Sequence, residues 1–231
     1  MKLLTIKEIK GKITLKSGLH IGAGDMEMKI GGTDNPVIKH PHTLEPFIPG
    51  SSLKGKVRSL LEMRSGLMKK SGGKPLSPSH LEKCNDEEKK EGKKILRLFG
   101  ASGADDEYLE ELGPTRISFA DAFLNEKWKK KATENQWSLI EVKSENTIDR
   151  IKGTAEHPRF IEHVPSGVEF DFCVALKIME NDEGLENFLI DGLRLLQMDA
   201  LGGSGSRGYG KIEFKFDDSE IQKKFDQETS R

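Results

Sequence analysis

The pattern of hydrophobic and polar residues predicts where the chain forms strands and helices. Alternation of the two kinds predicts strands, and hydrophobic residues three and four positions apart predict helices. Leucine, valine and phenylalanine recur three and four residues apart over 49–61 and 184–198, which predicts two helices with one buried face each. A break is expected near Gly11, inside the first alternating stretch. Apolar residues at every second position predict strands over residues 3–16, 115–124, 168–178 and 211–216.

Two regions interrupt this pattern. Residues 66–113 begin polar and rich in Gly, Pro and Ser and continue as a charged helical stretch, so an inserted helical and loop region, a lid, is expected there. Residues 140–165 contain two β-rich arms around a polar tip, which predicts a protruding β-hairpin. The basic run 127–131 is assigned to a solvated loop.

Without these regions the order is β, α, β, hairpin, β, α, β. This split βαβ order predicts the α+β class, with a ferredoxin-like (RRM-like) core of antiparallel sheet and two helices. The same scaffold occurs in RNA-recognition modules, whose sheets stack bases on aromatic residues. Aromatic residues make up only 6% of this chain, so contact with a nucleic-acid backbone is favoured over base stacking.

Composition narrows the class of protein further. With 231 residues the chain is long enough for one large core, and 32% charged residues indicate a soluble protein. No apolar run is long enough to cross a bilayer, and no signal-peptide pattern is present at the N-terminus, so no membrane partner is expected. Two cysteines, Cys84 and Cys173, cannot form a disulfide framework, which fits a cytoplasmic location.

Charge is distributed unevenly along a chain of net charge −1. Residues 1–75 contain 14 Lys and Arg against 6 Asp and Glu, whereas the remaining 156 residues contain 23 against 32. This asymmetry permits a basic face on a nearly neutral protein, as expected of a nucleic-acid binder.

A glycine-dense loop occupies residues 201–210. It lies between a predicted helix and a predicted strand, the reverse of the strand–loop–helix order of Walker and dinucleotide-binding loops, which excludes both. Glycines let the main chain approach a bulky polar group, and Arg207 supplies positive charge, so the loop is expected to lie against phosphates. The alternative is a loose connection between core elements. The expected RNA contacts are Gly202, Gly203, Ser204, Gly205, Ser206 and Arg207.

A second candidate phosphate site is the start of the helix at 49–61. Pro49 and Gly50 precede two serines, one of which is expected to be the N-cap. Basic side chains without acidic ones in the first two turns oppose the helix dipole, and an anionic partner would offset that. The alternative is an ordinary amphipathic surface helix. The expected contacts are Ser51, Ser52, Lys54, Lys56 and Arg58.

With these features established, the chain resembles the RAMP superfamily and, within it, backbone subunits of type III-A (Csm) CRISPR effectors. The resemblance spans nearly the whole chain and is carried by GLHIG at 18–22, GGTDNP at 31–36, IPGSSLKGKVR at 48–58, ENTIDR at 145–150 with GTA at 153–155, and GGSGSRGYG at 202–210. Some relatives hold a cysteine-based zinc cluster in the insertion. Because only His80 and Cys84 occur there, no zinc is expected.

The resemblance implies an architecture. Residues 1–231 would form a single RAMP domain, with its core at about 1–65, 114–140 and 166–216, a lid at 66–113 and a thumb hairpin at 140–165. Further copies would stack helically along CRISPR RNA, with other Csm subunits as partners. Base pairing would recognise the target, while the protein grips the backbone.

The resemblance also implies that complementary target RNA is cut at Asp34, with Mg²⁺ or another divalent cation. Asp34 could hold the metal or take the 2′-hydroxyl proton. His20 is expected to contact guide phosphate. Glu145, Asp121 and Asp149 are assigned to structural pairing. Three alternatives stay open, namely a non-catalytic RNA-binding scaffold, a type III-B backbone subunit, and a metal-independent endonuclease that processes CRISPR RNA with His20.

Overall fold

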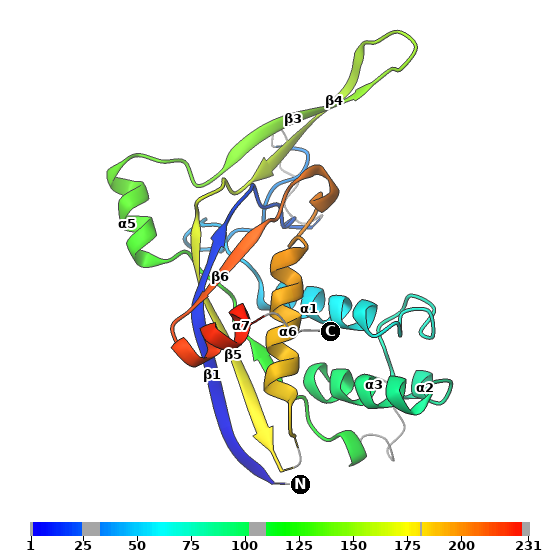
Figure 1. Cartoon of the computed structure of the whole chain (residues 1–231). Helices are drawn as coiled ribbons and strands as arrows, with labels where there is room; N and C mark the ends of the chain where they lie inside the picture. The colour runs from blue at the N-terminus through cyan, green and yellow to red at the C-terminus, as the bar shows by residue number, and fades with distance from the viewer. Residues whose placement is uncertain (1, 25–32, 102–109, 181, 228–231) are drawn as a thin grey trace.

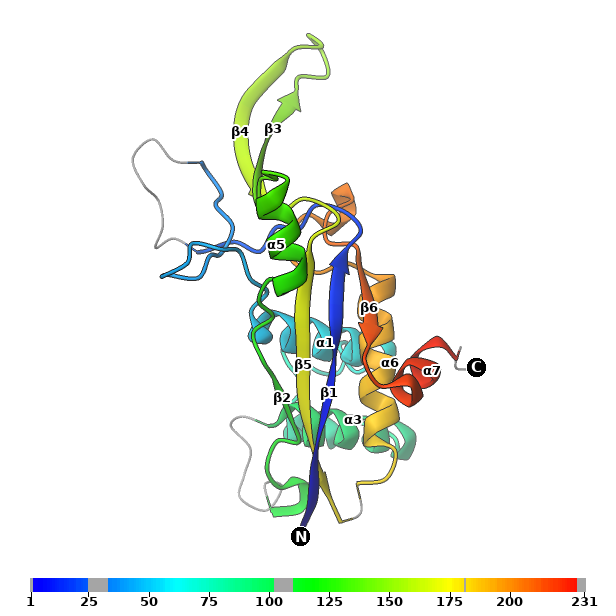
Figure 2. The same cartoon turned by 90° about the vertical axis from the view of Figure 1, so that its left-hand side faces the viewer.

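The computed structural model describes residues 2–24, 33–101, 110–180 and 182–227. Its centre is a four-stranded antiparallel sheet in the order β2-β5-β1-β6 (Figures 1 and 2). Alternate side chains of each strand are buried on one face of the sheet, as the period-two pattern predicts. The strands are β1 (Leu3–Leu15), β2 (Ile117–Phe119), β5 (Glu169–Met179) and β6 (Ile212–Phe216).

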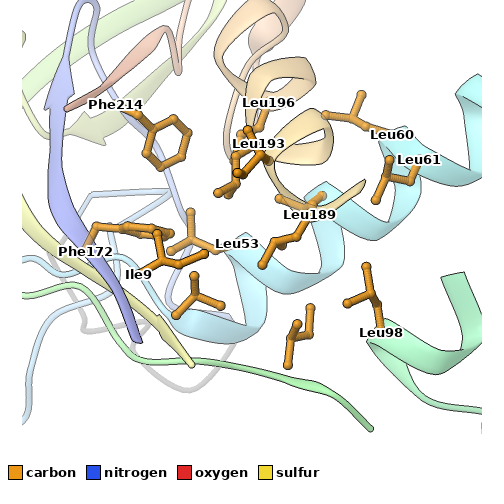
Figure 3. Packing of buried hydrophobic residues seen from close by; sticks show 14 of the residues in the cluster. Ile9, Leu53, Leu60, Leu61, Leu98, Phe172, Leu189, Leu193, Leu196 and Phe214 are labelled. Carbon is orange, nitrogen blue, oxygen red and sulfur yellow. The ribbon is translucent and has the colours of Figure 1, made fainter. Parts of the chain in front are cut away.

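Helices α1 (Gly50–Arg64) and α6 (Leu185–Met198) cover that buried face. They contact each other closely, since a Cβ on Gly192 of α6 would lie 2.7 Å from Val57 of α1. With α1 between β1 and β2 and α6 between β5 and β6, the predicted ferredoxin-like α+β core is confirmed. Figure 3 shows how sheet residues Ile9, Phe172 and Phe214 meet Leu53, Leu60 and Leu61 of α1 and Leu189, Leu193 and Leu196 of α6.

The break expected near Gly11 is absent, and β1 runs through it without interruption. Gly11 pairs with Phe172 on one side and Phe216 on the other. A Cβ at this position would lie 2.3 Å from the carbonyl oxygen of Lys215, so the glycine allows β6 to approach β1 closely. The only register shift between β1 and β5 lies near the start of β1, between Leu3 and Thr5.

The insertion lies beside the two core helices. It contains the short helix α2 (Pro78–Leu81) and the longer helix α3 (Asp86–Phe99), which Asn85 caps by accepting a hydrogen bond from the Glu88 amide. Apolar residues of this region join the main hydrophobic core, so the insertion extends the helical layer. These residues are Leu67, Leu76, Leu81, Ile95, Leu96, Leu98, Phe99 and Leu112.

The expected hairpin is formed by β3 (Glu141–Ile148) and β4 (Ala155–His163), which pair antiparallel and project beyond the sheet (Figure 1). Its register shifts between Glu145 and Thr147, where His157 and Pro158 of β4 oppose one residue of β3. His157 has φ +51°, so the hairpin contains a β-bulge halfway along its length.

Two helices were not expected from the pattern. Residues 127–131 lie in helix α5 (Glu126–Glu134) and not in a loop, because the Asn125 side chain accepts a hydrogen bond from the Trp128 amide and caps the helix. Helix α7 (Ser219–Asp226) packs Ile221 and Phe225 into the core beside β6 and α6. Within the described ranges, no helix combines the length and apolar character needed to span a membrane.

Candidate nucleic-acid interface at the base of the hairpin

The glycine loop packs on the segment 18–22, which follows β1. Its Gly203 amide donates to the His20 carbonyl at 2.8 Å, and the Gly210 amide donates to the Gly18 carbonyl at 2.8 Å. A Cβ on Gly202 (φ +74°) would lie 2.3 Å from the His20 carbonyl oxygen. A Cβ on Gly210 (φ +75°) would lie 2.0 Å from the Leu201 carbonyl oxygen. Gly202 therefore allows the contact with segment 18–22, and Gly210 allows the two ends of the loop to approach each other.

The rest of the loop faces outward. Gly203, Ser206 and Arg207 are exposed and Ser204 and Gly205 are half-buried. A 3₁₀ turn over Gly205–Arg207 follows Ser204, whose φ is +61°. The structure thus assigns the loop two tasks, with its ends fixed against the protein and its middle open to solvent. That open middle is what a phosphate backbone could contact.

His20 is held by the hairpin. Its Nδ1 lies 2.7 Å from the Glu162 carbonyl oxygen, and because a carbonyl only accepts, Nδ1 carries the proton. In the neutral ring, Nε2 is then the acceptor nitrogen. Nε2 lies next to Gly22, 3.6 Å from the position that a Cβ would occupy there. Because residue 22 is a glycine, no side chain of that residue covers Nε2.

Asp34 lies on a segment that pairs with β4. Asn35 and Ile161 form a parallel bridge, and the Glu162 amide donates to the Asn35 carbonyl at 3.1 Å. The Asp34 Oδ2 accepts a hydrogen bond from the Phe160 amide at 2.8 Å. One carboxylate oxygen of this exposed side chain is thereby fixed at the base of the hairpin. Of the matching motif at 31–36, residues 31 and 32 lie outside the described ranges.

Glu162 was missed in the sequence, yet it organises this corner. Its carboxylate accepts hydrogen bonds from the Thr33 hydroxyl and the Val37 amide, both at 3.1 Å, and pairs with Lys39 at 3.0 Å. Burial alone would raise the pKa of Glu162, but the Lys39 ammonium, the Val37 amide and the Thr33 hydroxyl together lower this pKa below its usual value. No motif spacing marks such a residue, because its partners come from a segment more than 120 positions away.

Arg207 joins the glycine loop to the hairpin. Its guanidinium donates to the Glu145 carboxylate and to the Ser204 hydroxyl, while its side chain stays 57% exposed. The Tyr209 hydroxyl donates to the same carboxylate at 3.4 Å. The Tyr209 ring lies edge-on to His163, with centroids 5.5 Å apart. Arg207 can therefore offer charge to an anion from a position fixed by the hairpin.

The start of α1 differs from the expected serine cap. The N-cap residue is Pro49, and neither Ser51 nor Ser52 caps the helix with its side chain. The Gly50 amide donates to the Asp121 Oδ1 at 2.7 Å, so a carboxylate beyond β2 performs the capping. A Cβ on Gly50 would lie 2.4 Å from the Phe119 carbonyl oxygen, which explains the glycine. Neither serine hydroxyl is therefore used to cap the helix.

The basic side chains of α1 separate into different surroundings. Lys56 pairs with Asp199 at 2.6 Å, which links the helix start to the residues just before the glycine loop. Lys54 is half-buried, and no other described side chain forms an ion pair with it. Of these two lysines, Lys56 is the one whose contact leads to the glycine loop.

Arg58 is the expected contact that the structure does not support. Its Nε donates to Glu62 at 2.7 Å, and its terminal nitrogens donate to the Gly100 carbonyl at 3.2 Å and the Leu76 carbonyl at 2.6 Å. Glu62 is only 6% exposed and also accepts from the Leu76 amide. The guanidinium therefore links the insertion to α1. The four-residue spacing of Lys54 and Arg58 in the sequence does not indicate this role.

The three carboxylates assigned to structural pairing have such partners, as expected. Asp121 caps α1, Glu145 pairs with Arg207, and Asp149 accepts from the Ile151 and Lys152 amides in the hairpin tip. These two amides lower the pKa of Asp149 below its usual value. Among the described residues, no three His, Cys, Asp or Glu side chains converge in a way that could hold a metal ion. Within the part of the chain that the structure describes, Asp34 would therefore be a single protein ligand.

The two side chains of the insertion weighed as zinc ligands also have local roles. The His80 Nδ1 takes part in the capping of α2, within 3.0 Å of the Ser77 amide and 2.9 Å of its hydroxyl. The Cys84 thiol donates to the His80 carbonyl at 3.4 Å. Burial raises the pKa of this thiol, which disfavours the thiolate that metals require.

Comparison with known proteins identifies the family of the chain. The family model described as RAMP superfamily matches residues 12–213, so the chain belongs to the RAMP superfamily. A protein of Methanocaldococcus jannaschii named CRISPR system Cms endoribonuclease Csm3 is 41% identical over 221 residues, covering 93% of this chain and 82% of that protein. A Streptococcus thermophilus protein of the same name is 41% identical over 218 residues, covering 92% and 89%. Within the superfamily, the chain is thus a member of the Csm3 family.

A solved structure supports the assignment. The crystal structure of a Csm3–Csm4 subcomplex in the type III-A CRISPR-Cas interference complex aligns with a TM-score of 0.55 and 30% sequence identity. The alignment covers 93% of this chain and 78% of the matched one. The resemblance first seen in the glycine loop and the Asp34 motif therefore extends over the described fold.

Proposed function

We propose that this protein is the CRISPR RNA-binding backbone subunit of a type III-A (Csm) complex and an endoribonuclease that cleaves complementary target RNA. The observation that carries the proposal is the convergence of three segments at the base of the hairpin. The segment with His20, the segment with Asp34 and the glycine loop all bond to one another or to β4. Relatives named endoribonuclease support the activity.

RNA would be held chiefly through its backbone. The exposed middle of the glycine loop offers amides and the Arg207 guanidinium, and the start of α1 offers Ser51, Ser52 and Lys54. Such contacts carry no sequence information, so recognition of the target is left to base pairing with the guide. Lys56 would act through Asp199 by holding the helix start against the loop. Arg58 is not part of this proposal.

Asp34 is the proposed catalytic residue. Its Oδ2 is held by the Phe160 amide, which leaves Oδ1 as the oxygen that can bind a cation or accept the 2′-hydroxyl proton. A single exposed carboxylate fits Mg²⁺, which in proteins keeps waters and substrate phosphates as most of its ligands. When bound, such a cation supplies positive charge that polarises the scissile phosphate. Attack of the 2′-hydroxyl on that phosphate would leave a cyclic phosphate and a free 5′-hydroxyl.

His20 would position RNA close to Asp34. The bond from Nδ1 to Glu162 fixes the ring, and Nε2 can accept a hydrogen bond or, when protonated, contact phosphate. Because β4 carries the partners of both His20 and Asp34, the two side chains keep a set relation to the hairpin.

Further copies of this chain, a Csm4-like subunit and other Csm subunits are the proposed protein partners. The relative solved together with Csm4 supports that proposal. A thumb role for the hairpin and a covering role for the insertion belong to the same proposal. Membership of the Csm3 family favours the type III-A complex over the type III-B alternative.

The test is reconstitution of the complex with guide and complementary RNA, comparing the wild type with Asp34→Asn. We expect the variant to lose target cleavage by at least about 100-fold and to keep guide binding, since the isosteric amide can no longer take a proton and binds cations poorly. EDTA should abolish wild-type cleavage. Cleavage that survives both EDTA and Asp34→Asn but is lost in His20→Ala would establish the metal-independent alternative. Intact target with the wild type and Mg²⁺ would establish a non-catalytic scaffold.

A further inference from the structure

Both tryptophans of the chain line one pocket beside the hairpin base. The pocket has a volume of about 480 Å³ and lies between helix α5, the segment that leads into β3, and the turn between β4 and β5. In Figure 2, α5 lies in front of the upper part of β5, on the face of the sheet away from α1 and α6. The residues that matter here are Trp128, Lys131, Trp137, Glu141 and Glu169.

The two indoles have different surroundings. Trp128 is half-buried and packs against the hydrophobic core, whereas Trp137 is 47% exposed. Their ring centroids are 6.4 Å apart and their planes are tilted by 43°, so one supports the other. The Lys131 ammonium lies over the Trp137 ring, 5.4 Å from its centre, so a base that stacks on this face takes the place of the ammonium. A large exposed aromatic ring with a cation close to it is a common platform for an unpaired nucleobase and its phosphate.

The polar groups of the pocket suit the same ligand. Glu141 is bonded to His163 at 3.1 Å and Glu169 pairs with Lys12 at 2.9 Å. Carboxylates held in this way can still accept hydrogen bonds from the amino groups of a base. The charge of Glu169 is balanced by Lys12, whereas Glu141 is bonded to the His163 imidazole and keeps an exposed carboxylate. The pocket thus offers hydrogen-bond acceptors at its edge, which suit the amino group of a nucleobase.

The pocket is connected to the proposed RNA site by side-chain contacts. Glu141 contacts His163, and the His163 ring lies against Tyr209 of the glycine loop. The Lys143 ammonium lies 5.3 Å from the centre of that same tyrosine ring. The hairpin base therefore has the glycine loop on one side and the two tryptophans on the other.

We propose that this tryptophan pocket binds an unpaired nucleobase of the RNA, with the base on Trp137 and its phosphate near Lys131. The proposal rests on the proposed RNA-binding function and deepens it. It also departs from the expectation that bases are not stacked, which followed from the low aromatic content of the chain. Content alone does not show that the two tryptophans share one pocket.

Tryptophan emission offers a direct test, because Trp128 and Trp137 are the only two tryptophans of the chain. The purified protein is titrated at low salt with a short single-stranded RNA oligonucleotide, and emission is compared with the anisotropy of the labelled oligonucleotide. We expect emission to be quenched with the same midpoint as binding, and Trp128→Phe to keep this quenching. Trp137→Ala should weaken binding roughly five- to tenfold, the lower range for loss of one stacked base.

Two controls isolate the base. An oligonucleotide of equal length with abasic sites keeps the phosphates and should bind without quenching. Phe123→Ala removes another exposed ring, one that stacks on Phe47 outside the pocket, and should leave both signals unchanged. Circular dichroism of Trp137→Ala shows whether that variant is folded. If it is unfolded, quenching in Trp128→Phe decides the question alone.

The outcomes separate the two proposals. RNA binding with unchanged emission, or equal quenching by abasic RNA, overturns the pocket and leaves the proposed function standing. No RNA binding by the wild type, alone or within the reconstituted complex, rejects both. An emission change that appears on raising protein concentration without RNA would assign the pocket to a second copy of the chain and overturn the proposal.

Discussion

Arg58 and Arg207 show how differently two regions of this molecule use the same side chain. Arg58 belongs to the helical flank, where α1 meets the insertion, and all of its bonds are to Glu62 and two carbonyls. Arg207 belongs to the hairpin base, where one carboxylate holds it while more than half of its side chain meets solvent. The helical flank thus uses the Arg58 guanidinium entirely for internal contacts, whereas the hairpin base leaves part of the Arg207 guanidinium exposed. We expect ligand binding in the region where charged groups are exposed and only partly paired within the protein.

The largest effect, a loss of folding stability, is expected from Arg58→Ala. Removing the guanidinium leaves the Glu62 carboxylate, which is almost fully buried, without its cation, and such changes cost about 3–5 kcal/mol. Urea unfolding should show this loss in the free energy of unfolding. Any weakening of RNA binding should disappear under conditions where the variant is fully folded. A folded, stable variant that binds RNA poorly would place Arg58 in the RNA site after all.

The next largest effect is expected from Gly202→Ala. The new Cβ would lie 2.3 Å from the His20 carbonyl oxygen at a backbone with φ +74°, a strain of about 1–3 kcal/mol. Its neighbour provides a matched control, since a Cβ on Gly203 meets nothing closer than 3.5 Å. Thermal unfolding should separate the two variants. Equal melting temperatures would show that the loop does not need its contact with segment 18–22.

A smaller effect is expected from Arg207→Ala and Lys54→Ala. Each removes one cation near the proposed phosphate path, so binding of guide RNA should weaken similarly for any sequence, and the slope of log K against log salt should fall by roughly one unit. Anisotropy titrations at several salt concentrations measure both quantities. Lys223→Ala, on α7 away from the hairpin base, is the control. A loss confined to certain guide sequences would contradict backbone recognition.

The smallest effect is expected on the stability of the fold at acidic pH, through Glu162. The partners of Glu162 hold its folded-state pKa below the usual value, so they stabilise the fold at pH values above the usual glutamate pKa. This contribution is lost as pH falls through the lowered pKa. Glu162→Gln should therefore flatten the acidic limb of the stability curve, with a difference of about 1 kcal/mol or less at neutral pH. Superimposable curves from urea unfolding at each pH would show that this carboxylate contributes nothing to stability.

The fold could be predicted well because the pattern of buried positions is local. Alternation in β5 and the leucine spacing of α6 show which face each element buries, and the order of elements then determines the topology. The expected break near Gly11 was wrong because the role of this glycine is not local. Its role depends on the Lys215 carbonyl, about 200 positions away, and no local pattern contains that neighbour.

The candidate site was predictable only where a motif marks it. The glycine loop, His20 and Asp34 stand out as residue types in unusual surroundings, and the structure brings their segments together. Glu162 and Glu62 do not stand out, because a glutamate in a polar stretch resembles any surface residue. Only the fold shows which carboxylates are buried and which cations they occupy.

The β-bulge at His157 has a geometric consequence for the hairpin. Below it, β4 pairs with the segment of Asn35 as well as with β3, and Val164, the residue after β4, pairs with Leu19. Above it, no described residue outside the hairpin pairs with the two arms. A single surplus residue bends the strand at this boundary and so sets the direction in which Ile151, at the far end, points. Deleting His157 would re-aim the outer arm while every buried residue of the sheet keeps its neighbours, so reach and orientation of this appendage can diverge between relatives without disturbing the core.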